Sequence, residues 1–236
     1  MKILIDRERL RRRATASHAA SLGGMLVILV AVVITMSRPQ WATLTAILLV
    51  VGFAVSSVGI YFANRWVKKP RPEDTLAQAL KGLGDPSRLY HYLLPMDHVL
   101  LTSSGVVVIE TVNLEGRFVF RGGRWKQHMP LGRALRFFVE ETFGNPIARA
   151  QADARRLSQL LDARLEVGGP PVPINALVLF VHPNADVIVE SPPIPVCQPA
   201  QLRKRLPAHL PKMPPARFDQ LRDALDEIGE VARLTG

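Results

Sequence analysis

Two acidic residues stand on neighbouring predicted strands at a spacing that could hold a metal ion. Asp97 precedes one apolar segment, and Glu110 lies near the end of the next. If Ser103 and Ser104 form a two-residue hairpin loop, the strand register pairs position 97 with position 110. Directly opposite residues have Cβ atoms about 5 Å apart, and two carboxylates that close repel each other unless a cation lies between them. This geometry suits a hard divalent cation such as Mg²⁺.

Other interpretations of these residues stay open. A loop shifted to Ser104 and Gly105 keeps the acids on one face but places them diagonally. Both acids could also be solvated or hydrogen-bonded strand-end carboxylates that hold no metal. His98 and His182 have no second ligand at metal-binding spacing, which favours core or turn roles for them.

The elements that position the acids follow from hydrophobic periodicity. The run Val106–Ile109 is apolar on both sides, which predicts a central strand covered on both faces. Asn145 and Pro146 predict a helix start, with the helix running to about Leu165. The other predicted elements are a helix over 72–84, strands over 89–94, 99–102, 106–112, 117–120 and 174–181, a short helix over 199–206, and a helix over 216–234. This order predicts an α/β fold in which helices flank a mixed sheet.

Two uncharged segments precede that fold. The first has 24 residues between Arg13 and Arg38, and the second has 26 residues over 39–64. Because about 20 apolar residues cross a bilayer, these segments predict a transmembrane helical hairpin. A cleaved signal peptide is disfavoured, since no cleavage site follows Met36 and the second span would halt export.

Basic residues flank the hairpin on both sides, whereas the loop between the spans holds only Arg38. The positive-inside rule then predicts a bacterial inner-membrane protein with both termini and its bulk in the cytoplasm. The predicted division is a basic N-terminus (1–18), two transmembrane helices (19–66), a linker (67–72), a domain (73–206) and a C-terminal helix (207–236).

Composition limits the classes of function. The chain has 30 Lys and Arg against 20 Asp and Glu, but residues 1–66 hold eight basic and only two acidic residues. Much of the excess charge therefore belongs to the membrane segment and does not indicate a general nucleic-acid coating. Arg203, Lys204 and Arg205 form either a solvated helix face or a set of phosphate contacts. The single cysteine, Cys197, excludes an internal disulfide framework and suits a small apolar side chain.

The segment from Asp97 to Asn113, with Gly116, Trp125, Asn145-Pro146 and Gln151, resembles the NERD (nuclease-related) domain. That family is a branch of the PD-(D/E)xK, restriction-endonuclease-like superfamily, and the resemblance covers about residues 73–206. It implies a mixed sheet flanked by helices, with Asp97 and Glu110 as catalytic metal ligands. It also implies Gln151 in the supporting helical motif. Glu73 matches the glutamate common in the family's first helix.

The chain departs from the family pattern two residues after Glu110, where Val112 replaces a lysine. A lysine there would reach the nucleophilic water and stabilise the charge on the phosphorane, and valine can do neither. Lys126, Arg117 and Arg124 are either substitute cations from an adjacent strand or ordinary solvated charges. Restoring the lysine with Val112→Lys is expected to leave stability nearly unaltered.

Three hypotheses of function follow. The first is a membrane-anchored domain with a degenerate nuclease site, which binds nucleic acid or a protein partner with little or no cleavage. The alternative is an active Mg²⁺-dependent DNA nuclease, in which Asp97, Glu110 and the Thr111 carbonyl hold the metal and a migrated Lys or Arg serves the reaction. A purely structural membrane partner has no support beyond the two spans.

Overall fold

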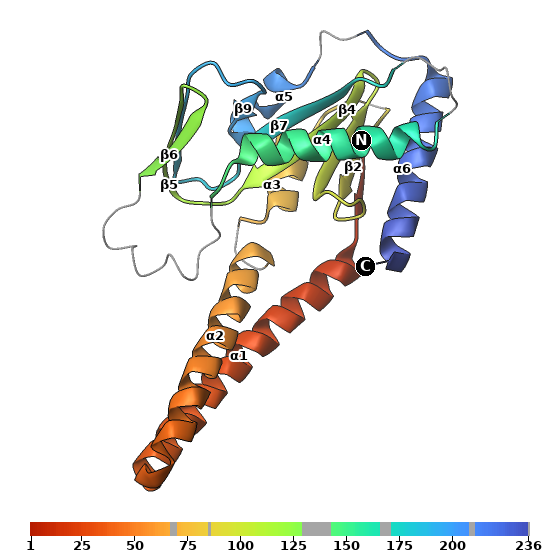
Figure 1. Ribbon diagram of the computed structural model, residues 1–236. Coiled ribbons are helices and arrows are strands. Elements are labelled where there is room, and N and C mark those ends of the chain that lie inside the picture. Colours follow the sequence, from red (N-terminus) through yellow and green to blue (C-terminus); the bar gives the residue numbers. More distant parts are fainter. Residues whose placement is uncertain (67–69, 85, 129–142, 166–170, 208–210, 236) are drawn as a thin grey trace. The chain divides into compact units, whose positions relative to one another are not determined.

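The computed structural model (Figure 1) describes the chain except for residues 67–69, 85, 129–142, 166–170, 208–210 and 236. The described residues fall into two compact units. One unit contains the two long helices within residues 7–66. The other combines residues 1–6 with residues 70–128 and 143–236.

The first unit is a helical hairpin made of α1 (Arg7–Ser37), the short 3-10 helix η1 (Pro39–Trp41) and α2 (Ala42–Trp66). Glycines allow the two helices to approach closely. A Cβ atom added to Gly24 would lie 2.4 Å from the backbone nitrogen of Ser56, and one added to Gly59 would lie 2.3 Å from that of Ser21. Small residues at helix contacts are typical of helix pairs in membranes.

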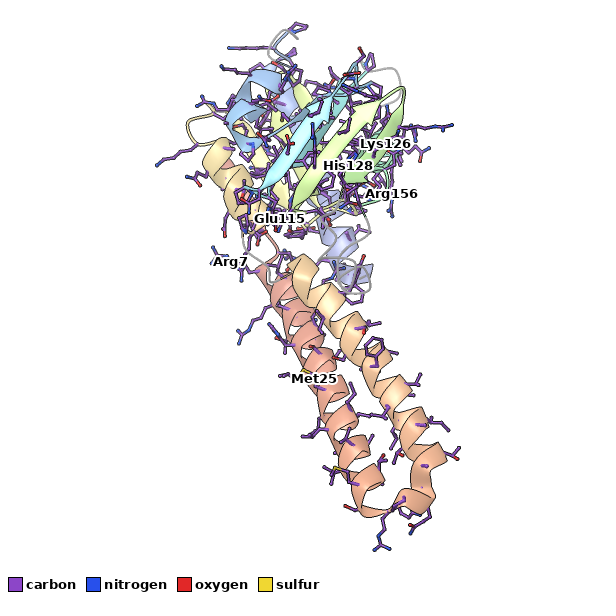
Figure 2. All side chains as sticks on the ribbon, turned by 90° about the vertical axis from the view of Figure 1, so that its left-hand side faces the viewer. Arg7, Met25, Glu115, Lys126, His128 and Arg156 are labelled. Atoms are coloured by element: carbon purple, nitrogen blue, oxygen red, sulfur yellow. The ribbon has the colours of Figure 1, made fainter. Side chains whose placement is uncertain are left out.

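By length and composition, both helices could cross a membrane, over Leu10–Ser37 and Pro39–Phe62. Only 11% and 22% of their most apolar windows are buried, whereas a core helix of a soluble protein is mostly buried. The exposed large apolar side chains include Leu22, Met25 (labelled in Figure 2), Leu26, Leu29, Met36, Val50 and Phe53. The predicted hairpin of two long apolar helices is thus confirmed.

The second unit is built on a six-stranded sheet in the order β1-β2-β3-β4-β7-β9. The strands are β1 (Lys2–Ile5), β2 (Ser87–His91), β3 (His98–Thr102), β4 (Gly105–Val112), β7 (Ile174–Phe180) and β9 (Val196–Cys197). The β2-β3 and β3-β4 pairs are antiparallel, and the other pairs are parallel. The predicted α/β class with a mixed sheet is therefore confirmed.

The β3-β4 hairpin has the register that a Ser103-Ser104 loop predicts. Val99 pairs with Val108, and Thr102 pairs with Gly105. The alternative loop at Ser104-Gly105 is excluded by this register. Gly105 has a φ of +135°, and a Cβ atom there would lie 2.5 Å from the carbonyl oxygen of Pro173, so the start of β4 requires glycine.

The sequence predicts no strand before the hairpin, yet residues 2–5 form β1 and pair in parallel with Arg88–His91 of β2. Four residues directly before a helix are too few for their alternation to distinguish a strand from a helix start. One edge strand thus precedes the hairpin, and the rest of the sheet follows it. Both ends of the hairpin lead into the same folded unit.

A second sheet has three strands in the order β6-β5-β8: β5 (Gly116–Arg121), β6 (Arg124–His128) and β8 (Ala185–Val189). The sequence predicts only β5 among them. In β6 the outward positions are charged, which hides the strand pattern. Phe118, Phe120 and Trp125 point to the opposite face and pack in one aromatic cluster with Phe143 and Phe180.

The helices are α3 (Pro72–Ala79), α4 (Pro146–Asp162), η3 (Pro199–Gln201), α5 (Leu202–Arg205) and α6 (Pro215–Thr235). Helix α4 lies across the strands of the larger sheet (Figure 1), where Leu157 and Leu161 pack with Val108 of β4. On the other face, Ile109 packs with Leu76 of α3. The central strand is therefore covered on both faces, as predicted.

The C-terminal helix shares this core. Phe218, Leu221 and Leu225 of α6 lie in the same buried cluster as Val106 and Leu157. The predicted boundary at residue 207 therefore separates no independent body, because α6 covers part of the sheet.

Candidate functional site

Glu110 lies in β4 on the face that α4 covers, and its side chain is only 16% exposed. The Nε of Arg149, on α4, donates to Glu110 Oε1 at 2.6 Å. A second nitrogen of the same guanidinium donates to the carbonyl oxygen of Phe143 at 3.1 Å. A cation from the chain itself thus sits on the carboxylate that the sequence predicts as a metal ligand.

The start of α4 fixes the position of Arg149. Asn145 caps the helix, and its side-chain oxygen accepts from the Ala148 backbone N–H at 3.1 Å. Arg149, Asp153 and Arg156 then recur at helical spacing and form a polar stripe next to the buried residues of α4. The sequence interpretation missed this stripe, although the spacing of charges after the predicted cap could have revealed it.

Asp97 precedes β3, and its carbonyl oxygen accepts from the Tyr92 backbone N–H at 2.8 Å. Extending the β3-β4 register by two residues places Asp97 opposite Glu110. Burial raises the pKa of Glu110, and Asp97 and Asp153 act in the same direction, whereas Arg149 opposes it. Burial also raises the pKa of Asp153, again with the help of Asp97. Three carboxylates therefore share one electrostatic environment.

Arg149 and Arg156 offset this concentration of negative charge. Both lower the pKa of Asp153, and the ion pair with Arg149 lowers that of Glu110. Guanidinium groups of the chain itself thus offset the negative charge, a role that the sequence interpretation assigns to a bound cation.

Val112 is 3% exposed and packs with Ile147, Ala150, Phe118 and Phe180. It lies two residues after Glu110, so both side chains leave the strand on the same face. An ammonium group at this position would enter an apolar cluster. The burial of Val112 argues against the expectation that Val112→Lys leaves stability nearly unaltered, because moving a charge into an apolar environment is costly.

Three other predicted site residues, Gln151, Thr111 and Glu73, make different contacts from one another. Gln151 is half-buried on α4, and Thr111 pairs with Leu179 in the β4-β7 ladder. Glu73 lies in the first turn of α3, is 6% exposed, and accepts from the Tyr92 hydroxyl at 3.2 Å. The backbone N–H of Tyr92 donates to the Asp97 carbonyl oxygen, so the contact of Glu73 with Tyr92 links α3 to the segment before β3.

Lys126, Arg117 and Arg124 lie on the outward face of the small sheet. They alternate with the residues that pack in the aromatic cluster, and Arg117 forms an ion pair with Asp186 at 3.3 Å. In this structure the cation next to Glu110 is Arg149, and these three side chains line a separate surface hollow.

The predicted phosphate-binding residues of α5 divide into two kinds. Arg203 donates to the carbonyl oxygens of Lys81 and Gly82, both at 3.2 Å, and so holds the turn after α3. Lys204 and Arg205 are exposed.

The remaining candidates have structural roles. His98 is buried, with its Nδ1 at 2.8 Å from that of His91, and His182 Nδ1 accepts from the Asn184 backbone N–H. Core and turn roles are thus confirmed for His98 and His182. Cys197 is buried, and burial raises its pKa to about 11, which suits an inert apolar side chain.

The donor set around Glu110 does not fit a resident Mg²⁺. Within the described parts of the chain, no three His, Cys, Asp or Glu residues are grouped to hold a metal ion. Mg²⁺ needs near-octahedral oxygen ligands at about 2.0–2.1 Å, and the Arg149 guanidinium already occupies Glu110 Oε1. An ion at Glu110 Oε1 would have to compete with this arginine.

Comparison with known families supports the relationship that the motifs indicate. Residues 72–181 match the family model NERD, the nuclease-related domain. The comparisons with curated proteins and with solved structures found no match. The matched segment includes Asp97, Glu110 and Arg149. The folded unit that surrounds the hairpin in sequence therefore contains a nuclease-related domain of the NERD family, over residues 72–181.

Proposed function

We propose that this protein is a membrane-anchored nuclease-related domain that binds nucleic acid at the cytoplasmic face of a bacterial inner membrane, with little or no cleavage. The observation that carries the proposal is the ion pair between Arg149 and Glu110 at 2.6 Å. It puts a permanent internal cation on the carboxylate that metal-dependent chemistry would need.

Hydrolysis of a phosphodiester by a metal-dependent site requires an activated water and a cation that stabilises the developing negative charge. Here the guanidinium neutralises Glu110, and Val112 offers no charge at the position of the motif lysine. Asp97 and Asp153 remain near Glu110, but the two arginines offset their charge. This arrangement argues against hydrolysis of a phosphodiester at this site.

The location at the membrane is supported by the exposed apolar surfaces of α1 and α2. Because β1 and β2 pair within one folded unit, the segments before and after the hairpin must lie on the same side of the bilayer. Two spans satisfy this condition and one span would not. The basic residues next to both outer helix ends support a cytoplasmic location for that side.

An active nuclease is the second candidate. It is favoured by the electrostatic coupling of Asp97 and Asp153 to Glu110, with Arg149 as the cation that could replace the motif lysine. Lys126 and Arg117, the substitutes that the sequence suggests, would have to reach this cluster from the outward face of the small sheet.

The two candidates are separated by a cleavage assay on the full chain in detergent micelles, with supercoiled plasmid and either Mg²⁺ or Mn²⁺. The full chain is required because a fragment beginning after the hairpin would lack β1. We expect nicking by the natural protein to equal that of Asp97→Asn/Glu110→Gln. Nicking that the double variant abolishes would establish the nuclease instead.

A further inference from the structure

The outward face of the small sheet concentrates positive charge. Side chains of a strand alternate between faces, so those that do not join the aromatic cluster share the other side. The residues of this side, here called the basic face, are Arg117 and Arg121 of β5 and Arg124, Lys126 and His128 of β6. All five are exposed, and Figure 2 labels Lys126 and His128 on the strand.

The basic face is hollowed. Its side chains line a depression of about 360 Å³ together with Val119 and Ile188. The three strands are joined by ladder pairing, with Val119 next to both Lys126 and Ile188. The hollow is therefore set by a hydrogen-bonded sheet and has an apolar floor with a cationic rim.

Part of this charge is already paired. Arg117 lies 3.3 Å from Asp186, and Arg121 lies 2.7 Å from Glu190. Side chains of both pairs are more than half exposed, so solvent screens them and a ligand phosphate can compete for the arginines.

The side chains of Arg124 and Lys126 are not paired in this way. Within the described part of the chain, no ion pair involves the side chain of Arg124 or Lys126. Four arginine and lysine side chains thus face two carboxylates, which leaves two positive charges over the hollow.

We propose that the basic face binds the phosphodiester backbone of a nucleic acid, an inference that rests on the proposed function and names its contact surface. A concave cationic rim complements a row of phosphates, and backbone binding needs only positive charge along a groove.

The basic face is unsuited to inserting into a bilayer. Outside the hairpin, the exposed large apolar side chains among the described residues are Ile3, Val231 and Leu234, and none lies on this sheet.

The test is the binding of fluorescent DNA and RNA oligonucleotides to the full chain in zwitterionic nanodiscs, over a series of salt concentrations and without divalent metal. The variant Arg124→Glu/Lys126→Glu should weaken binding at least about 10-fold. It should also reduce the slope of log affinity against log salt by about 2. The matched control is Lys81→Glu/Lys212→Glu, which changes the charge equally at two exposed positions outside the small sheet and should bind like the natural protein. The melting temperatures of both variants should equal that of the natural protein, because all four residues are exposed.

Each other outcome overturns the proposal in a distinguishable way. If the natural protein binds nucleic acid and the β6 variant binds equally well, the basic face is not the contact surface, while the proposed function stands. Equal weakening by the control variant would indicate a general effect of net charge. If the natural protein binds no oligonucleotide, the proposed function fails as well. If it binds only vesicles with anionic lipid, and the β6 variant loses that binding, the partner is the membrane surface.

Discussion

Arg149 neutralises part of the negative charge of the acid cluster formed by Glu110, Asp97 and Asp153. In the Arg149→Ala variant, this cluster should bind a divalent ion more readily. A hydrogen bond to a charged group contributes about 1.5–3 kcal/mol to stability. Since the Arg149 side chain is 43% exposed, solvent screening places this pair near the lower end, at about 1–2 kcal/mol. A metal ion at Glu110 Oε1 in the natural protein competes with this pair, and loss of about 1.4 kcal/mol of pairing would weaken the affinity for the metal about 10-fold.

The assay is calorimetric titration of Mg²⁺ into the full chain and into Arg149→Ala, with Arg155→Ala as the control because Arg155 is exposed on the same helix. We expect Arg149→Ala to bind Mg²⁺ at least about 10-fold more tightly than either of the others. Adding Glu110→Gln to the variant should remove that gain. Equal Mg²⁺ affinity in the natural protein and in Arg149→Ala would show that the arginine does not compete with the metal ion for the carboxylate.

The same variant should be sensitive to pH, since loss of Arg149 raises the pKa of Glu110 further. A carboxyl with a raised folded pKa binds more protons in the folded state, so stability falls as pH rises through the interval above its ordinary value. Denaturation of Arg149→Ala should therefore show a larger loss relative to the natural protein at pH 8 than at pH 4. A loss that is independent of pH would mean that Glu110 is not the group affected.

Three further predictions concern other parts of the chain. Val112→Lys should lower the free energy of unfolding by at least about 2 kcal/mol in urea denaturation, because Val112 is 3% exposed and packs among aromatic side chains. An unchanged denaturation midpoint would show that the ammonium group avoids the core. Burial and the charge of His98 lower the pKa of His91 to about 3, so the unfolded chain binds the extra proton between pH 6.5 and 3. Stability should then fall with falling pH across this window by up to about 1.4 kcal/mol per pH unit, and His91→Asn should flatten the curve. A membrane-impermeant thiol reagent applied to intact cells should modify a cysteine placed at Gln40 and spare one placed at Gly236, with the reverse pattern contradicting the proposed orientation.

The elements that the sequence predicts well are those with strong local signals. Asn145-Pro146 sets both the cap and the start of α4, and Ser103-Ser104 sets the β3-β4 register, because each depends on only a few adjacent residues. Strands β1, β6 and β8 lack such signals. Strands β1 and β8 pair with strands distant in sequence, as when Lys2–Ile5 pairs with residues 88–91 across the whole hairpin. Strand β6 pairs with the adjacent β5, but the charged residues at its outward positions hide its pattern.

The site was predictable only in part, for the same reason. The sequence identifies Asp97 and Glu110 and detects the missing lysine at position 112. The cation next to Glu110 comes from a helix 39 positions along the chain, so nothing in the local strand pattern indicates it. Lys126 and Arg117 were reasonable substitutes by sequence distance, but strand alternation directs them to the outward face.

The proposed function is nucleic-acid binding by this nuclease-related domain without metal-dependent hydrolysis. A single preparation of the full chain with one fluorescent DNA can show both properties, with binding measured by anisotropy and cleavage by gel in the presence of Mg²⁺. We predict binding that weakens with salt, and no cleavage beyond that of Asp97→Asn/Glu110→Gln. Cleavage that needs Mg²⁺ and disappears in that double variant would contradict the claim and identify the acid cluster as a working active site.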